Sequence, residues 1–185
     1  MNTAAAVGTG WLLTYMSRRE LIDEWGVTRD LVLLPPVLAS TPSVRYVFVT
    51  EDVRQELCGP WDTPEHTIRY TRARAVVDAF TGGLRIAARY PPSRSAKAQL
   101  ALLDPAHEEV WEFRSREPKP GVRVFGCFSE LDTFIALWTE LRENIDEDFK
   151  KEREECKRQW RKFFPTFAPH TGANLSDYIT NYYPV

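Results

Sequence analysis

The chain has few cysteines and no long apolar run. Its three cysteines, Cys58, Cys127 and Cys156, lie far apart and form no C-x-x-C pair or close Cys/His spacing, so the sequence indicates neither a disulfide framework nor a zinc site. No apolar run approaches the ~20 residues of a membrane span, and no positively charged segment precedes the short apolar run near the N-terminus. These absences predict a cytoplasmic protein with no membrane partner, no metal and no other cofactor.

The chain also lacks an excess of charge of either sign. Its 24 Lys and Arg residues face 26 Asp and Glu residues, which gives a net charge of -2. An anionic partner such as RNA would therefore have to bind a local cationic patch. With 185 residues, of which 43% are hydrophobic, the chain can bury a core as one domain or as one domain with a smaller appendage.

The first third of the chain predicts a helix, a strand and a second helix. Residues 17–25 predict a short helix, because Ser17 and Glu20 have capping-box spacing and apolar residues follow at helical intervals. Residues 44–50 are β-branched and aromatic, which predicts a buried strand. Residues 51–57 after it fit a helix.

A segment that contains glycine and proline, residues 59–67, breaks both patterns. We place a domain boundary near residue 65. Residues 1–65 are then an N-terminal α/β extension, and residues 66–185 are the main unit with a C-terminal amphipathic helix.

The main unit reads as helix, strands and helix. In chain order it predicts a helix that ends at Gly82 and Gly83, strands at 110–114 and 121–128, and a helix from Asp146 to Pro165. Residues 133–141 fit a strand and a helix equally well, and the aromatic-rich remainder after Pro165 is expected to pack over the core. The predicted class is α+β, with a small antiparallel sheet packed with helices.

Four cationic side chains lie within residues 110–128, in two predicted strands and the turn between them. Side chains two apart in a strand share a face, so Glu112 and Arg114 point away from the aromatic residues beside them. The turn brings the second strand back antiparallel to the first. Arg123 can therefore approach Glu112 or Arg114, on a sheet face expected to be charged and exposed.

The motifs W-E-F-R-S, residues 111–115, and G-V-R-V-F, residues 121–125, resemble the RelE/HigB/ParE toxin superfamily, which has phage-derived members. With the helix before them and the apolar run after them, the resemblance covers roughly residues 71–144. Family members with RNase activity cut messenger RNA, commonly on the ribosome, with a compact antiparallel sheet and helices on one side. The resemblance implies a RelE-like core, metal-free RNA cleavage in a toxin-antitoxin system, and as partners RNA or the ribosome and a cognate antitoxin or other protein.

The resemblance also implies roles for single residues. Arg123 matches the strand arginine that contacts the scissile phosphate, and Glu112 with Arg114 matches an E-x-R motif whose acid is a base in some relatives. Metal-free cleavage needs a proton acceptor, so Glu112 or His107 would move the proton while Arg114 and Arg123 stabilise charge. The candidate catalytic residues are Glu112, Arg114, Arg123 and His107. The candidate RNA-binding residues are Arg114, Arg116, Lys119, Arg123 and Arg142, and Arg142 is the loosest match.

Other interpretations stay open at this point. Arg114 and Arg123 also fit a surface set of cross-strand ion pairs with Glu112 and Glu117. The mostly acidic residues 138–148 stand where relatives carry a basic cluster. This favours an alternative function, a non-catalytic interaction or inhibitor protein on a toxin-like fold that binds an anionic partner. A plain structural component is the third class.

Overall fold

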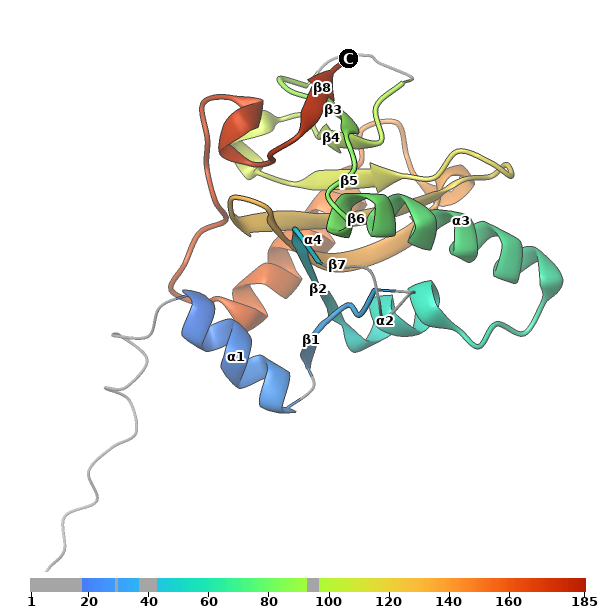
Figure 1. Ribbon diagram of the computed structural model, residues 1–185, viewed down its shortest axis with the longest axis horizontal. Helices are drawn as coiled ribbons and strands as arrows, with labels where there is room; N and C mark the ends of the chain where they lie inside the picture. Colours follow the sequence, from blue (N-terminus) through green and yellow to red (C-terminus); the bar gives the residue numbers. More distant parts are fainter. Residues whose placement is uncertain (1–17, 29, 37–42, 93–96) are drawn as a thin grey trace, which may run out of the picture.

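The structure is a computed structural model that describes residues 18–28, 30–36, 43–92 and 97–185 (Figure 1). Four α-helices and one eight-stranded sheet form within these segments. The helices are α1 Arg18–Thr28, α2 Glu51–Cys58, α3 Pro64–Thr81 and α4 Lys150–Phe163, with short 3-10 turns η1 Ala106–Glu108, η2 Arg142–Asn144 and η3 Leu175–Asp177. The strands are β1 Leu31–Leu33, β2 Tyr46–Thr50, β3 Ile86–Arg89, β4 Leu100–Leu102, β5 Trp111–Arg114, β6 Val122–Glu130, β7 Thr133–Leu141 and β8 Tyr182–Pro184.

The sheet has the strand order β1-β2-β7-β6-β5-β4-β3-β8 (Figure 1). Neighbours are antiparallel from β4 through β7 and at the β1–β2 edge, whereas β2 pairs parallel to β7 and β3 pairs parallel to β4 and β8. The predicted α+β class is confirmed, with a sheet that is larger than expected and mixed. The division at residue 65 stays a prediction, and β1 and β2, from before it, belong to the same sheet as the later strands.

The elements with a clear period lie where the sequence predicts them. Helices α1, α2 and α4 and the strands β2, β5 and β6 occupy predicted segments, and β5 and β6 pair as expected. Helix α3 is expected only within residues 71–84, but it begins at Pro64, so residues 64–67, expected to form a loop or boundary, are helical. Ser17, half of the proposed capping box, lies outside the described residues. Residues 133–141 form strand β7 rather than a helix. Residues 134–137 are all buried, as is typical of a strand covered on both faces.

Helices cover both faces of the sheet, which differs from the one-sided arrangement implied by the family resemblance. On one face α3 packs over the side of β5 and β6 that carries Trp111 and Val124, and α2 packs next to α3 over β2 and β7. On the other, α1 and α4 cover Phe125, Cys127 and Ile135. The second face is apolar along most of β6 and β7, so it needs a helix to remove it from water. The expectation of a charged, exposed second face is therefore wrong: most of this face is apolar and covered, and its charged end at Glu112, Arg114 and Arg123 is also largely buried.

The C-terminal segment packs on the core, as expected. Tyr178 and Ile179 are fully buried, and β8 adds an edge strand next to β3. Arg45, also fully buried, donates to the carbonyl oxygens of Phe80 and Asn181 at 3.1 and 3.2 Å and forms an ion pair with Asp132 at 3.3 Å. One guanidinium group thus ties the end of α3 to the C-terminal segment.

Helix α4 carries a buried carboxylate, that of Glu152. Glu152 is fully buried, and neither carboxylate oxygen has a hydrogen-bond partner in the described part of the chain. Burial raises the pKa of Glu152; its own backbone N–H and Lys151 lower it, and the charges of Glu140 and Asp146 raise it further. A carboxyl with a raised pKa in the folded state favours folding when protonated.

Replacing Glu152 with methionine is expected to stabilise the fold by about 1–3 kcal/mol near neutral pH, because an uncompensated buried polar group is removed. The wild type should lose stability as the pH rises from the pKa of a free glutamate, about 4.3, through the higher folded-state value. Urea unfolding at several pH values measures both effects, and the gain should shrink in acid. A gain of equal size in the exposed-site control Glu154→Met would contradict this account.

Candidate anion-binding site

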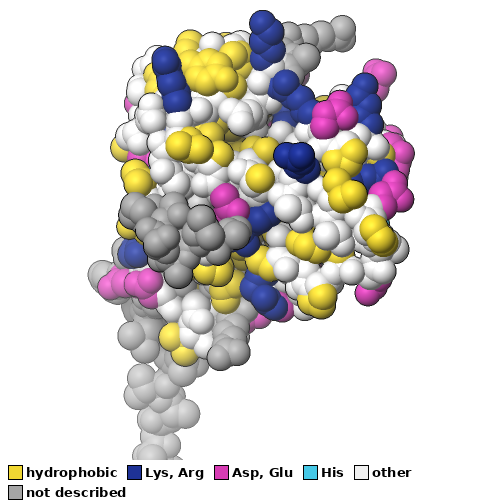
Figure 2. Space-filling view, turned by 45° about the vertical axis from the view of Figure 1, so that its right-hand side comes forward, with side chains coloured by type: hydrophobic (Ala, Val, Ile, Leu, Met, Phe, Trp, Pro, Cys, Tyr) yellow, Lys and Arg dark blue, Asp and Glu magenta, His cyan; other side chains and the backbone are white. Residues whose placement is uncertain are grey.

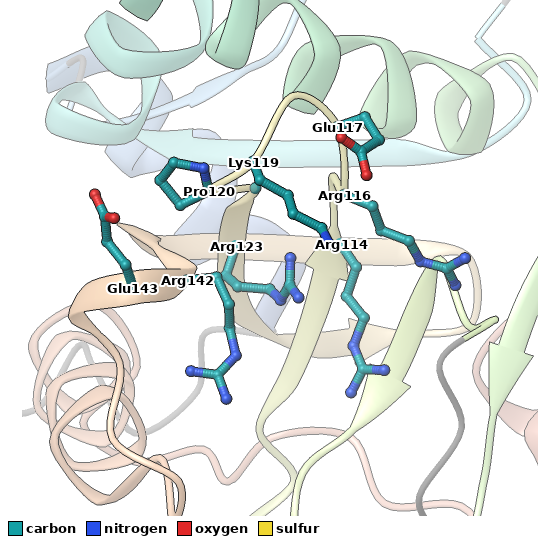
Figure 3. A pocket seen from close by; sticks show the side chains of 9 residues that line it. Arg114, Arg116, Glu117, Lys119, Pro120, Arg123, Arg142 and Glu143 are labelled. Atoms are coloured by element: carbon teal, nitrogen blue, oxygen red, sulfur yellow. The ribbon is translucent and has the colours of Figure 1, made fainter.

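A pocket of about 620 Å³ opens beside the turn that joins β5 to β6. Its lining residues are Arg114, Arg116, Glu117, Lys119, Pro120, Gly121, Arg123, Arg142 and Glu143. All five residues predicted to bind RNA are among them. We call this site the arginine pocket. Figure 3 shows the guanidinium group of Arg123 between those of Arg114 and Arg142.

The pairing of β5 with β6 brings the inner arginines together. Arg114 lies directly opposite Arg123 in the register, and Glu112 is two residues earlier on the same face. Glu112 Oε1 is 2.5 Å from Arg114 Nη2, and Glu112 Oε2 is 3.1 Å from Arg123 Nε. One carboxylate therefore holds two guanidinium groups that would otherwise repel each other.

This ion-pair set is buried rather than on the surface. The side chain of Glu112 is 0% exposed, and those of Arg114 and Arg123 are 12% and 13% exposed. The expectation that both guanidinium groups stay exposed is wrong, because Glu112 holds both of them and Arg123 Nη1 also donates to the carbonyl oxygen of Ser115, at the start of the turn, at 2.7 Å. Glu117, the other carboxylate of the expected set, lines the pocket instead.

Positive charge is concentrated around Arg123. Burial lowers the pKa of Arg123 to about 10, Glu112 opposes this shift, and the charges of Arg114, Arg142 and Arg116 add to it. The group is still protonated at neutral pH. A guanidinium whose protonated form is disfavoured by its neighbours gains stabilisation from any anion that enters the pocket.

The outer cations come from the turn and from η2. Arg116 is exposed and donates to the carbonyl oxygen of Ala98 at 3.0 Å, while Lys119 is exposed on the same turn. Arg142, the first residue of η2, donates to the carbonyl oxygen of Ile145 at 2.8 Å. Two of the three outer cations, Arg116 and Arg142, are therefore held at the pocket by hydrogen bonds from their guanidinium groups to backbone carbonyl oxygens.

The two residues proposed as proton acceptors do not line the arginine pocket. Glu112 is fully buried beneath it and engaged by two arginines. His107, on η1, lines a different pocket of about 520 Å³ together with Trp160 and Phe164. His107 is near β5 in sequence but does not lie at the arginine pocket. The reason is that η1 leads into the first residue of β5, whereas the pocket lies beside the turn that follows its last residue.

A second pocket, of about 560 Å³, adjoins the arginine pocket through Arg114, which lines both. Its lining residues are Arg89, Pro92, Leu103, Asp104, Pro105, Arg114, Glu147, Asp148, Phe149 and Arg153. We call it the adjoining pocket. Phe149 falls within residues 146–165, which the sequence predicts to be a helix, but it precedes α4 and its ring lies under the guanidinium of Arg142, 5.4 Å away. No periodic signal marks Arg89, which ends a four-residue strand.

The cysteines offer no reactive thiol at either pocket. Cys127 and Cys156 are buried, and burial raises the pKa of both thiols well above the usual value. Among the residues placed in the structure, no group of His, Cys, Asp and Glu side chains is arranged to hold a metal ion. No helix within the described ranges is long and apolar enough to cross a membrane.

No protein-family model, no curated protein and no solved structure matches the chain. The resemblance to the RelE/HigB/ParE superfamily therefore stays a prediction, and the function has to be argued from the site.

Proposed function

We propose that this protein binds single-stranded RNA non-catalytically, with a backbone phosphate held in the arginine pocket. The observation that carries the proposal is the convergence of five cations on one pocket. They come from β5, from the turn, from β6 and from η2. The proposal corresponds to the alternative function given in the sequence analysis, a non-catalytic interaction protein that binds an anionic partner.

The chemistry of the pocket suits phosphate. A guanidinium presents a planar fork of N–H groups that matches two oxygens of one phosphate, and it stays charged at neutral pH. The cations outnumber the carboxylates Glu117 and Glu143 at the pocket and Glu112 beneath it. A compact anion of high charge density is favoured over the spaced carboxylates of an acidic protein segment.

The surroundings limit how much nucleic acid can bind. Glu143, Asp146, Glu147 and Asp148 follow Arg142 in the chain and would repel a long polyanion. Figure 2 shows cationic and acidic side chains next to one another on the face that it presents. One or two phosphates of a flexible strand fit such a mixture better than the continuous backbone of a duplex. Binding to RNA also agrees with the predicted cytoplasmic location.

A second candidate function is the metal-free cleavage of messenger RNA by a toxin-like protein, with the ribosome and an antitoxin as partners. One observation favours it, because the carboxylates Glu117 and Glu143 line the same pocket as the arginines. We rank it second since Glu112 and His107, the proton acceptors implied by the family, do not reach the pocket. Incubation with messenger RNA followed by gel analysis tests it, and cleavage that is lost in Arg123→Ala would place it first.

The double variant Arg116→Ala, Lys119→Ala is expected to bind a short oligoribonucleotide about 5- to 30-fold more weakly, since two exposed contacts contribute about 1–2 kcal/mol together. Fluorescence anisotropy at several salt concentrations measures the affinity. For one or two phosphates, log K should fall with log [salt] with a slope of about -0.7 to -1.4, and the variant should have a shallower slope.

The matched control is Arg161→Ala, Lys162→Ala, which removes two exposed cations from the last turn of α4. The control changes the net charge equally and should bind as the wild type does. Equal weakening in both double variants would mean that RNA responds only to net charge, and the pocket would not be the site. A wild type that fails to bind RNA at low salt would overturn the proposed function.

A further inference from the structure

Phe149 has an unusual backbone conformation immediately before α4. Its φ is 54° and its ψ is 23°, in the left-handed region that bulky side chains rarely adopt. The surrounding chain fixes this conformation: Phe149 N donates to Asp146 O, and Phe149 O accepts from Arg153 N, at 3.3 and 3.0 Å. Strained residues of this kind concentrate at ligand sites, where the strain places a side chain.

The ring of Phe149 is held at the border of the two pockets. It lines the adjoining pocket and meets the buried ring of Phe125 in an edge-to-face arrangement with centroids 6.2 Å apart, and the guanidinium of Arg142 lies 5.4 Å from its centroid. Arg142 itself lines the arginine pocket. An aromatic ring fixed next to a phosphate-binding guanidinium is the arrangement by which proteins stack a base of a single strand.

The adjoining pocket has the charge for a base rather than for a second phosphate. Three carboxylates, Asp104, Glu147 and Asp148, line it together with three arginines, so its charges balance. Carboxylates repel phosphate, but they accept hydrogen bonds from the exocyclic amino groups of cytosine, adenine and guanine. Uracil has no amino group to offer them.

We propose that the adjoining pocket binds the nucleobase of the nucleotide whose phosphate occupies the arginine pocket, stacked on Phe149, with amino-bearing bases preferred to uracil. This inference rests on the proposed binding of RNA and adds to it a base subsite with a specificity. Arg114, which lines both pockets, and Arg142, which lies over Phe149, connect the phosphate subsite to the base subsite.

The test compares Phe149→Leu with Phe149→Trp against three probes of equal length: oligocytidylate, oligouridylate and an abasic ribose-phosphate strand. Loss of the ring should weaken oligocytidylate binding about 5- to 150-fold, the range found when a stacking aromatic is removed. Binding of the abasic strand should not change. The tryptophan variant should restore binding to oligocytidylate and should quench a 2-aminopurine placed in the strand.

The outcomes separate this inference from the proposed function. Equal weakening of all three probes in Phe149→Leu would show that Phe149 only supports the fold, and unchanged binding of oligocytidylate would remove the stacking role. Equal affinity of the wild type for oligocytidylate and oligouridylate would overturn the base preference. A wild type that binds none of the probes, the abasic strand included, would instead overturn the proposed function itself.

Discussion

Replacing Glu112 with alanine is expected to lower the free energy of unfolding by about 3–5 kcal/mol, as is typical when one partner of a buried ion pair is removed. Glu112 is fully buried, and Arg114 and Arg123 both reach its carboxylate. Without it, two guanidinium groups directly opposite each other in the β5–β6 register would repel, with little access to water. Chemical denaturation measures the loss.

Glu117→Ala is the matched control, because Glu117 is exposed on the adjacent turn and lines the same pocket. It should change stability by less than about 0.5 kcal/mol. If Glu112→Ala were as stable as the wild type, the carboxylate would not be the counter-charge of the arginines. A folded variant that lost RNA cleavage would then support a role of Glu112 as base.

The sequence predicts those helices and strands in which the alternation of apolar and polar residues repeats over enough positions to be recognised. The helices and the strands β2 and β6 are at least five residues long, and the four residues of β5 alternate clearly between aromatic and charged side chains, whereas β1, β3, β4 and β8 have three or four residues each and show no such pattern. The ambiguous residues 133–141 illustrate the limit of periodicity. A strand covered by helices on both faces is apolar throughout, so its sequence does not alternate.

The composition of the arginine pocket was predictable, but its depth was not. Alternation along β5 and β6 places Glu112, Arg114 and Arg123 on one face, and this depends only on local register. Their burial depends on how the surrounding segments pack against this end of the sheet, which the register of two strands does not determine. His107 shows the converse, since closeness in sequence to β5 does not bring it to the pocket.

The role of Phe149 could not be predicted for a different reason. Its spacing from Cys156 and Trp160 fits the apolar stripe of a helix, and those two residues are indeed buried on α4. The left-handed backbone at Phe149 makes α4 begin at Lys150, so Phe149 lies outside the helix and its ring lines the adjoining pocket. A positive φ at a phenylalanine has no signal in a single sequence.

Replacing the whole buried ion set is expected to separate stability from binding. In the triple variant Glu112→Leu, Arg114→Met, Arg123→Met, the charges disappear together and side chains of similar length fill the space. Such replacements are typically neutral or stabilise a protein by about 1–4 kcal/mol, since no desolvated charge is left without a partner. Arg89 loses both the attraction of Glu112 and the repulsion of Arg114. Denaturation should therefore show a stability at or above that of the wild type.

The same triple variant should bind oligoribonucleotide at least about 100-fold more weakly, because two charge-assisted contacts to phosphate, about 1.5–3 kcal/mol each, are lost. Titration by fluorescence anisotropy beside the unfolding curves measures both quantities on one sample. A variant that is stable and still binds RNA as the wild type does would show that the buried arginines serve the fold alone. Arg116, Lys119 and Arg142 would then carry the site, and the position of the phosphate would move outward to the turn and η2.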